Sequence, residues 1–291
     1  MMLLTNEVMS WHTSFRIGGA ADYYARVSDT CDLSQAVFFA DRRGLPIFVL
    51  GRGSNILVSD RGIRGLVIEN RMEEVSVACD GRMRAASGVP LASLARLACR
   101  HGLSGLEWAA GIPGTLGGAI VANAGAFGHS VGDILSWVGM LTSDCTELVL
   151  CKEELAFGYR TSLFKQNGAR NQQIILEAEL ALRPAPREEV EAHLKHCIQM
   201  RKQTQPLGPN AGSIFKNPPG DYAGRLIEAV GLKGCGMGDA RISRKHANFM
   251  LNMGSARASD VAGLIELARK RVTEQFGVWL ELEIELVGDW Q

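Results

Sequence analysis

The chain has 291 residues, and its content of 46% hydrophobic and 21% charged residues is that of a folded globular protein rather than a disordered one. Lys and Arg number 31, and Asp and Glu also number 31, so the formal net charge is +0. This balance argues against a dedicated nucleic-acid-binding protein, because such proteins usually carry a basic excess. The seven cysteines are odd in number and form no Cys-x-x-Cys pair, so neither a disulfide framework nor a four-cysteine zinc site is predicted.

The first 182 residues are predicted to mix helices and strands, with more strand than helix. Residues 1–19 lack the basic start and the long apolar run of a signal peptide, so none is expected. One helix is predicted over residues 32–43, capped by Asp32, and a second over residues 91–101, ended by Gly102. Strands are predicted at residues 45–50, 56–59, 66–69, 134–150 and 173–182, the first of them buried.

Two prolines within residues 183–186 mark the predicted boundary between two domains. Beyond it, a highly charged helix is predicted over residues 187–203 and a clearly amphipathic helix over residues 260–276. Residues 278–287 alternate apolar and acidic side chains, which predicts one continuous strand. The acidic face of this strand carries Glu281, Glu283 and Glu285.

Glycine is unusually frequent, with 33 residues where average usage predicts about 20, and it concentrates in two segments. GRGSN at residues 51–55 precedes a strand rather than a helix, so it is a poor match to a dinucleotide-binding Rossmann motif. It is either a hairpin turn or a cradle of amides for a phosphate, assisted by Ser54 and Asn55. Residues 111–128 hold six glycines and four alanines, which disfavours a plain helix or strand. That segment is either a structural loop or a loop whose bare backbone offers amides to a closely approaching ligand.

The remaining polar candidates are individually uninformative. Ser213 follows a glycine in a turn-prone region, Arg160 is one of many arginines, and Glu283 has the pattern of a solvated strand face. His246 is expected to be a hydrogen-bonded structural residue. The six histidines show no metal-binding spacing, and no metal site is predicted.

The order of the segments along the chain is far more specific than any one of them. The succession is TSFRIGG, GRGSNILVSD, GIPGTLGGAIVANAGAFG, FGYRTSLFK, NAGSIFKNP, AGRLIEAVGLKG, SRKHANFMLN and LELEIELVG. It resembles the UDP-N-acetylenolpyruvoylglucosamine reductase family, also called UDP-N-acetylmuramate dehydrogenases, over residues 11–288. The length and the direct run through residues 160–182 are similar to the shorter of the two types in that family.

The resemblance implies an α+β fold. An FAD-binding domain of the PCMH/vanillyl-alcohol-oxidase type, with two α+β subdomains, is expected over residues 15–182, followed by a smaller α/β substrate-binding domain over residues 183–291. The implied protein is a flavoprotein oxidoreductase that uses NADPH as co-substrate in peptidoglycan synthesis, and thus in cell wall biogenesis, cell shape and cell division. FAD is expected to be non-covalent, because the first glycine loop offers neither His nor Cys for attachment.

The same resemblance assigns roles to individual residues. Arg160 would stabilise the enolate-like charge on the substrate, assisted by Glu283, and Ser213 would donate the proton. The charges of Glu281 and Glu285 are expected to favour partial protonation of Glu283 by like-charge repulsion. The expected FAD-binding residues are Gly51, Arg52, Gly53, Ser54, Asn55, Gly114, Thr115, Gly117, Gly118 and Ala119. The expected substrate contacts are Tyr159, Asn217 and Gln205.

Two positions depart from the family pattern. Thr204 and Gln205 stand where many relatives carry a lysine, so the residue at the substrate diphosphate is left open. Glu285 stands where relatives often carry an arginine, so the charge around Glu283 is unusual. The alternatives are another flavin oxidoreductase of this fold that acts on a sugar or lactone, and a non-catalytic nucleotide-binding module. The expected partners are UDP-N-acetylglucosamine-enolpyruvate and NADPH, without nucleic acid or membrane, for a monomer in the cytoplasm.

Overall fold

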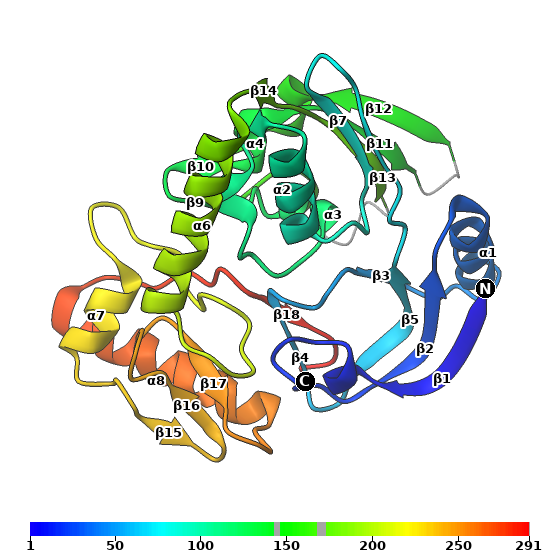
Figure 1. The fold of residues 1–291 in the computed structure, drawn as a ribbon. Helices are drawn as coiled ribbons and strands as arrows, with labels where there is room; N and C mark the ends of the chain where they lie inside the picture. The colour runs from blue at the N-terminus through cyan, green and yellow to red at the C-terminus, as the bar shows by residue number, and fades with distance from the viewer. Residues whose placement is uncertain (143–145, 168–172, 291) are drawn as a thin grey trace. The chain divides into compact units, whose positions relative to one another are not determined.

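The structure is a computed structural model that describes residues 1–142, 146–167 and 173–290 (Figure 1). The chain divides into two compact units, each made of several stretches of sequence. Unit 1 comprises Met1–Leu3, Ala25–Gly51 and Val67–Arg201, and unit 2 comprises Leu4–Tyr24, Arg52–Leu66 and Lys202–Gln291. The division into functional domains at residue 183 stays a prediction.

Unit 1 is built on a five-stranded antiparallel sheet of order β12-β11-β13-β7-β6. Its strands are β6 (Val75–Val77), β7 (Arg82–Ala86), β11 (Leu135–Leu141), β12 (Glu147–Cys151) and β13 (Ile174–Ala181). Helices α2 (Leu91–Arg100) and α3 (Leu116–Val121) lie beside this sheet in Figure 1, and buried side chains of the sheet and of both helices form one core.

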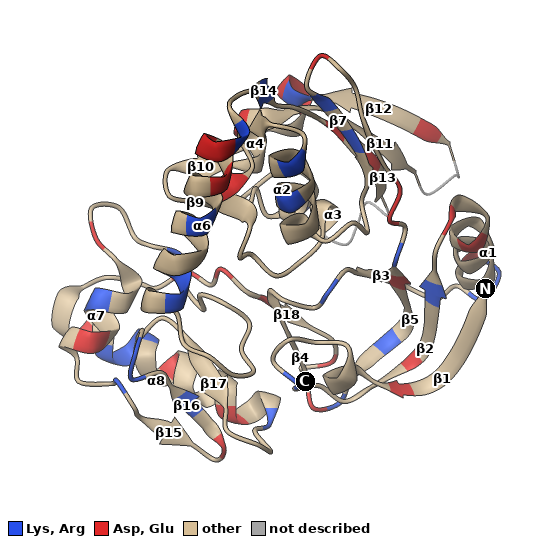
Figure 2. Cartoon of the chain, in the orientation of Figure 1, with Lys and Arg blue, Asp and Glu red and all other residues tan. Residues whose placement is uncertain are grey.

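Helix α6 (Arg187–Thr204) packs Val190 and Leu194 into the core of unit 1. Figure 2 shows acidic residues at the start of this helix and basic residues toward its end. This distribution complements the helix dipole, whose positive end is at the N-terminus. The predicted charged helix is therefore confirmed.

A four-stranded sheet has the order β1-β2-β5-β3. Its strands are β1 (Met2–Val8), β2 (Ala20–Val27), β5 (Ile63–Asn70) and β3 (Ile47–Leu50). Strand β3 was expected to be buried, but it forms an edge of the sheet, and only Leu50 of its four residues is buried.

Helix α1 (Thr30–Asp41) begins two residues before the predicted start. Asp29 has extended backbone angles and its carboxylate accepts a hydrogen bond from the Asp32 amide at 2.8 Å, so Asp29 is the cap. The prediction of Asp32 as the cap is therefore wrong, because Asp32 already lies in the first helical turn.

Unit 2 contains a three-stranded antiparallel sheet and two helices. The strands are β15 (Gly236–Met237), β16 (Ala240–Ile242) and β17 (Met250–Asn252), and the helices are α7 (Ala223–Ala229) and α8 (Ala258–Phe276). The predicted apolar stripe of α8 is buried in the core except at Phe276, which is 37% exposed, and Gly277 ends the helix at φ 67°, as the sequence predicts. Beside them, β4 (Ile56–Val58) and β18 (Glu285–Val287) pair in parallel.

The prediction of one continuous strand over residues 278–287 is wrong. Leu282 forms an isolated bridge with Phe215, the chain bends at residues 283–284, and only Glu285–Val287 form a strand. The bend moves the chain from one hydrogen-bonding partner to another, so the buried face changes from Leu280 and Ile284 to Val287, and Leu286 is 40% exposed.

Residues 111–128 were expected to lack regular structure, yet they contain helix α3. Thr115 caps this helix, and Leu116 and Ile120 are buried beneath it. The tertiary burial of these side chains outweighs the poor helix propensity of Gly117 and Gly118.

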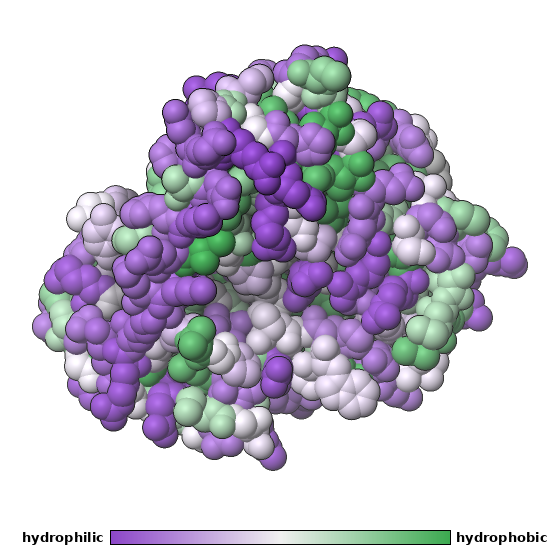
Figure 3. Space-filling model, viewed as in Figure 1, coloured by the Kyte–Doolittle hydropathy of each residue, from purple (hydrophilic) through white to green (hydrophobic). Residues whose placement is uncertain are grey.

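The remaining elements are short. They are β8 (Leu103–Ser104), β9 (Gly125–Ala126), β10 (His129–Ser130), β14 (Arg183–Pro184), α4 (Val131–Ile134), α5 (Leu163–Asn167) and the 3₁₀ turns Met9–Trp11, Glu107–Ala109 and Lys152–Leu155. Within the described ranges, no helix combines the length and apolarity needed to cross a bilayer. The face drawn in Figure 3 is largely hydrophilic, with scattered apolar patches.

Candidate active site

The GRGSN turn is held in place by hydrogen bonds from the TSFRIGG segment of unit 2. The amide and the hydroxyl of Ser14 both donate to the carbonyl of Gly53, at 3.0 and 3.3 Å. Gly53 has φ +56°, and a Cβ there would lie 2.4 Å from the carbonyl oxygen of His12, so only glycine fits. Among the described residues, the amides of Arg52 and Gly53 donate to no protein acceptor. The turn therefore presents backbone donors of the kind that bind a phosphate.

Asn55 joins this turn to the segment that carries Glu283. The Asn55 side-chain amide donates to the carbonyl of Glu283 at 3.2 Å, and the amide of Glu285 donates to the carbonyl of Asn55 at 3.0 Å. These bonds continue directly into the parallel pairing of β4 with β18. Two segments 228 residues apart in sequence are thus fixed side by side.

Ser213 and Glu283 are held on adjacent stretches of backbone. The amide of Glu283 donates to the carbonyl of Ile214 at 2.8 Å, and Phe215 bridges Leu282. On its other side, Ser213 bridges Phe249. Glu281, which was expected to add like charge near Glu283, forms an ion pair with Lys216 at 3.2 Å.

Asn248 holds the serine segment in place, and sequence reasoning missed it. Its Oδ1 accepts from the Phe215 amide at 2.9 Å, while its Nδ2 donates to the Phe215 carbonyl at 2.8 Å. The side chain is buried, so it satisfies two backbone groups away from water. The only signal in the sequence was the position of Asn248 inside the SRKHANFMLN motif.

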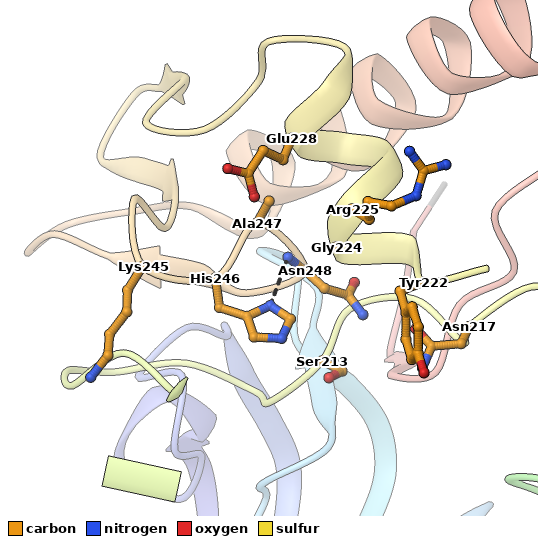
Figure 4. A pocket seen from close by; sticks show the side chains of 10 residues that line it. All are labelled: Ser213, Asn217, Tyr222, Gly224, Arg225, Glu228, Lys245, His246, Ala247 and Asn248. Carbon is orange, nitrogen blue, oxygen red and sulfur yellow. Dashed lines mark hydrogen bonds between the residues drawn. The ribbon is translucent and has the colours of Figure 1, made fainter. Parts of the chain in front are cut away.

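A polar pocket of about 280 Å³ lies next to Ser213 in unit 2 (Figure 4). Its lining is rich in hydrogen-bond donors and cationic groups, which suits an anionic, polar ligand. The lining side chains are those of Ser213, Asn217, Tyr222, Arg225, Glu228, Lys245, His246, Ala247 and Asn248, with Gly224. Of the predicted substrate contacts, Asn217 lines this pocket, whereas Gln205, just after the end of α6, does not.

Asn217 also fixes the start of α7, because its Oδ1 accepts from the Ala223 amide at 3.1 Å. Arg225 on that helix forms a two-point ion pair with Asp221. This pairing lowers the pKa of Asp221 to about 2. The positive charge of Arg225 at the pocket is thus partly offset by its neighbour.

The Nδ1 of His246 accepts a hydrogen bond from the Asn248 amide at 3.2 Å, as Figure 4 shows. Burial lowers the pKa of His246, and the nearby charge of Lys233 lowers it further. The neutral ring therefore carries its proton on Nε2, the nitrogen left to face a ligand. His246 is hydrogen-bonded, as the sequence analysis expects, and it also lines the pocket.

The second glycine segment lies in unit 1, and its glycines allow close packing. A Cβ on Gly117 would lie 3.0 Å from the Ser87 Cβ, and one on Gly51 would lie 2.5 Å from the Thr115 Oγ1. The amide of Gly117 donates to the Ser87 carbonyl, and the amide of Gly118 donates to the Thr115 hydroxyl. These amides, expected to be offered to a ligand, therefore have protein acceptors. Gly118 remains exposed.

Arg160 lies in a tight turn of unit 1. Gly158 and Thr161 exchange backbone hydrogen bonds across the turn, and Arg160 has φ +55°, an uncommon value for a residue with a side chain. Its Nη2 donates to the Gly125 carbonyl at 2.9 Å, and its guanidinium lies 5.8 Å from the ring centre of Tyr159. Tyr159 itself is exposed.

Arg201 is a second arginine near Arg160, and sequence reasoning missed it. Its side chain packs against Gly111, and its guanidinium lies 5.8 Å from the ring centre of Phe127. Burial lowers the pKa of Arg201, and the like charge of Arg160 acts in the same direction. Two cationic side chains therefore share this region of unit 1.

Two family models match the chain. Residues 21–150 match the FAD binding domain, and residues 202–287 match the C-terminal domain of UDP-N-acetylenolpyruvoylglucosamine reductase. The prediction that the chain binds FAD is confirmed by the first match.

Individual relatives agree over nearly the full length. The UDP-N-acetylenolpyruvoylglucosamine reductase of Moorella thermoacetica is 47% identical and covers 99% of this chain and 94% of its own. Reductase 2 of Symbiobacterium thermophilum is 45% identical over 97% of this chain and 91% of its own. The crystal structure of the enzyme from Thermus caldophilus has a TM-score of 0.82 and 37% identity, covering 98% of each chain.

These matches confirm the predicted fold class, an FAD-binding domain of the PCMH type with a second α/β domain. They also confirm the predicted FAD-dependent oxidoreductase that uses NADPH, and its length agrees with the shorter type. The chain belongs to the UDP-N-acetylenolpyruvoylglucosamine reductase family.

Proposed function

We propose that this protein reduces the enolpyruvyl ether of UDP-N-acetylglucosamine-enolpyruvate to the lactyl ether of UDP-N-acetylmuramate, with NADPH as the reductant. The observation that carries the proposal is the pairing of the Ser213 segment with the Glu283 segment beside a cationic pocket. A proton donor, a carboxyl group and an anion-binding pocket are the groups that this reaction on a sugar nucleotide requires.

Bound FAD would supply the hydride chemistry, passing the hydride of NADPH to the methylene carbon of the substrate. The amides of Arg52 and Gly53 suit the diphosphate of this cofactor, with Ser54 and Asn55 extending the same turn. In unit 1, Gly51, Gly114, Thr115, Gly117, Gly118 and Ala119 form the second proposed FAD contact. There, the exposed Gly118 leaves the backbone accessible.

Arg160 is proposed to stabilise the negative charge that develops on the substrate carboxylate and the adjacent carbon. A guanidinium remains charged at any physiological pH and presents a fork of donors that matches a carboxylate. The anchoring of Nη2 on the Gly125 carbonyl fixes the orientation of this fork before the substrate arrives. Preorganised charge of this kind is often the largest catalytic contribution.

Ser213 is proposed to give its hydroxyl proton to the carbon next to the carboxylate, after hydride has reached the methylene carbon. A hydroxyl is a weak acid, but a carbon-centred enolate is a strong base, so the transfer is downhill when the geometry is right. The backbone amide of Glu283 donates to the carbonyl of Ile214, the residue after Ser213. Its carboxyl group is proposed to assist by adjusting the charge around the reacting group.

The pocket is proposed to take the nucleotide diphosphate of the substrate, with Asn217 as a contact. Lys245 and His246 add a cation and a neutral N–H donor that the sequence analysis did not assign. Tyr159 and Gln205 remain proposed substrate contacts. The protein is further proposed to act as a monomer in the cytoplasm, with the FAD-binding part in residues 15–182 and the substrate-binding part in residues 183–291.

A single-turnover reaction without oxygen tests the proposed activity. Protein reduced by NADPH is mixed with UDP-N-acetylglucosamine-enolpyruvate, and flavin absorbance and product are followed. UDP-N-acetylglucosamine, which lacks the enolpyruvyl ether, is the matched control. Re-oxidation of the flavin by UDP-N-acetylglucosamine-enolpyruvate, and not by UDP-N-acetylglucosamine, supports the proposal. Reduction of the oxidised flavin by a free sugar or lactone would instead indicate another flavin oxidoreductase, and binding without any redox change would indicate a nucleotide-binding module.

A further inference from the structure

Helix α3 ends in a motif whose left-handed residue is usually glycine and sometimes asparagine. The amide of Asn123 donates to the carbonyl of Ile120 at 3.1 Å, and the amide of Ala124 donates to the carbonyl of Ala119 at 2.8 Å. This pair of bonds is the Schellman arrangement, in which the residue after the cap takes a left-handed conformation. That residue is Asn123, with φ 42°. Asparagine is tolerated at this position, although glycine is more favourable, and unlike glycine it adds a side chain that can make hydrogen bonds.

The side chain of Asn123 connects three segments of unit 1. Its Nδ2 donates to the carbonyl of Gly158 at 2.8 Å, and its Oδ1 accepts from the amide of Gly132 at 3.0 Å. Gly158 opens the tight turn that carries Arg160, and its carbonyl also accepts from the Thr161 amide. One amide group therefore ties the end of the glycine-rich segment to the turn of the proposed catalytic arginine.

Two further hydrogen bonds join the same pair of segments. The hydroxyl of Ser162, which is fully buried, donates to the carbonyl of Val121 at 2.7 Å. The guanidinium of Arg160 donates to the carbonyl of Gly125 at 2.9 Å. Both the backbone after Arg160 and its side chain are thus fixed on residues 121–125. A left-handed backbone such as that of Arg160 persists only where its surroundings hold it in place.

We propose that Asn123 is a positioning residue for Arg160, and that its side chain fixes the arginine turn to the segment expected to bind FAD. The inference rests on the proposed role of Arg160. The amide acts through the carbonyl of Gly158, two residues before the arginine, and sets where the guanidinium meets the developing charge. Glycine, the other residue common at this position, could not make these side-chain hydrogen bonds.

Asn123→Gly is a clean test, because glycine keeps the backbone of the Schellman motif and removes only the side chain. The expected result is retained FAD, a melting temperature somewhat lowered by the loss of the two side-chain hydrogen bonds, and flavin reduction by NADPH within about twofold of the unsubstituted protein. Re-oxidation by UDP-N-acetylglucosamine-enolpyruvate should slow by about 10- to 100-fold, as expected for a displaced catalytic group. Asn123→Asp, which keeps the acceptor for Gly132 but loses the donor to Gly158, should slow re-oxidation similarly. Asn6→Gly is the matched control, because Asn6 is exposed and also has positive φ, at 54°.

Combination with Arg160→Lys separates the two proposals. If Asn123 acts through Arg160, Asn123→Gly should add no further loss of re-oxidation rate in the Arg160→Lys background. Four outcomes would overturn the inference and leave the role of Arg160 intact. They are a full additional loss in the Arg160→Lys background, equal losses in both half-reactions, loss of FAD from both Asn123 variants, and unchanged re-oxidation in Asn123→Gly. Unchanged re-oxidation in Arg160→Lys would instead overturn the role of the arginine itself.

Discussion

The amide of Glu283 donates to the carbonyl of Ile214 at 2.8 Å, and Ile214 directly follows Ser213. The amide of Ile284 approaches the same oxygen at 3.5 Å, where the chain bends before strand β18. The relative position of the serine and the glutamate is therefore set by main-chain hydrogen bonds. Replacing either side chain should leave the other in place, which makes both accessible to mutation.

Glu283→Gln should lower the rate of substrate-driven flavin re-oxidation by about 100-fold or more, as losses of preorganised electrostatic groups commonly do. The melting temperature should stay close to that of the unsubstituted protein, because the anchoring bonds belong to the backbone. The measurement is the single-turnover rate as a function of pH. A variant whose pH–rate limbs match those of the unsubstituted protein would show that Glu283 does not titrate in the reaction. Glu281→Gln, on the neighbouring ion pair with Lys216, is the matched control.

Asn248→Ala should reduce the free energy of unfolding by about 2–4 kcal/mol, because it leaves a buried N–H and a buried C=O of Phe215 without partners. Activity should fall together with stability, since the Phe215 backbone positions Ser213. Asn210→Ala is the control: Asn210 also makes two side-chain bonds to backbone, to Gly208 and Gly212, but it is only half-buried. Equal losses in urea titrations of both variants would contradict the role assigned to burial.

Asp60 caps helix α8, accepting from the amides of Ala258 at 2.7 Å and Ser259 at 3.0 Å. Burial acts to raise the pKa of Asp60, but the hydrogen bonds from Ser259 and Ala258 outweigh it, and the pKa lies below its ordinary value of 3.8. The contribution to stability is therefore present above pH 3.8 and lost as the pH falls through the lower folded-state pKa.

Asp60→Ala should consequently cost about 1 kcal/mol at neutral pH, and the cost should shrink in acid. Urea titrations at several pH values measure both effects. The exposed Asp41 provides the control substitution, Asp41→Ala. A loss that stays constant down to the most acidic pH would rule out the carboxylate as the cap.

His246 should make stability depend on pH in the range of its ordinary pKa of 6.5. Burial lowers the folded-state pKa, so the folded protein binds fewer protons than the unfolded chain. The contribution of neutral His246 to stability is therefore fully present above pH 6.5. The free energy of unfolding declines as the pH falls through that value toward the folded-state pKa of His246. His246→Gln should flatten this part of the stability profile, while His193→Gln, at an exposed position on α6, should not. Identical profiles for the two variants would contradict the assignment.

Local signals in the sequence predicted several elements well. The apolar spacing of α8 and its terminal Gly277 were sufficient, because helix periodicity and capping are local properties. The bend at residues 283–284 could not be predicted, since alternation within 278–287 says nothing of the change of partner from Ile214 to Asn55. That change depends on tertiary contacts, which the local sequence pattern does not encode.

The candidate site divides in the same way. The order of the motifs identified the family and the segments around Arg160, Ser213 and Glu283. The sequence predicts only a structural role for His246 and none for Lys245, because their place in the pocket depends on proximity to Ser213 and α7 that no sequence spacing encodes. Asn123 likewise lies in a glycine-rich segment that gives no sign of its role, because that role depends on hydrogen bonds to residues 132 and 158.

The two half-reactions of Ser213→Ala test the central proposal most directly. Flavin reduction by NADPH should stay near the rate of the unsubstituted protein, while re-oxidation by UDP-N-acetylglucosamine-enolpyruvate should fall by about 100-fold or more, the scale of a lost general acid. Ser34→Ala, at an exposed position on α1, should change neither rate. Re-oxidation of Ser213→Ala at the undiminished rate, with the normal product formed, would contradict the account.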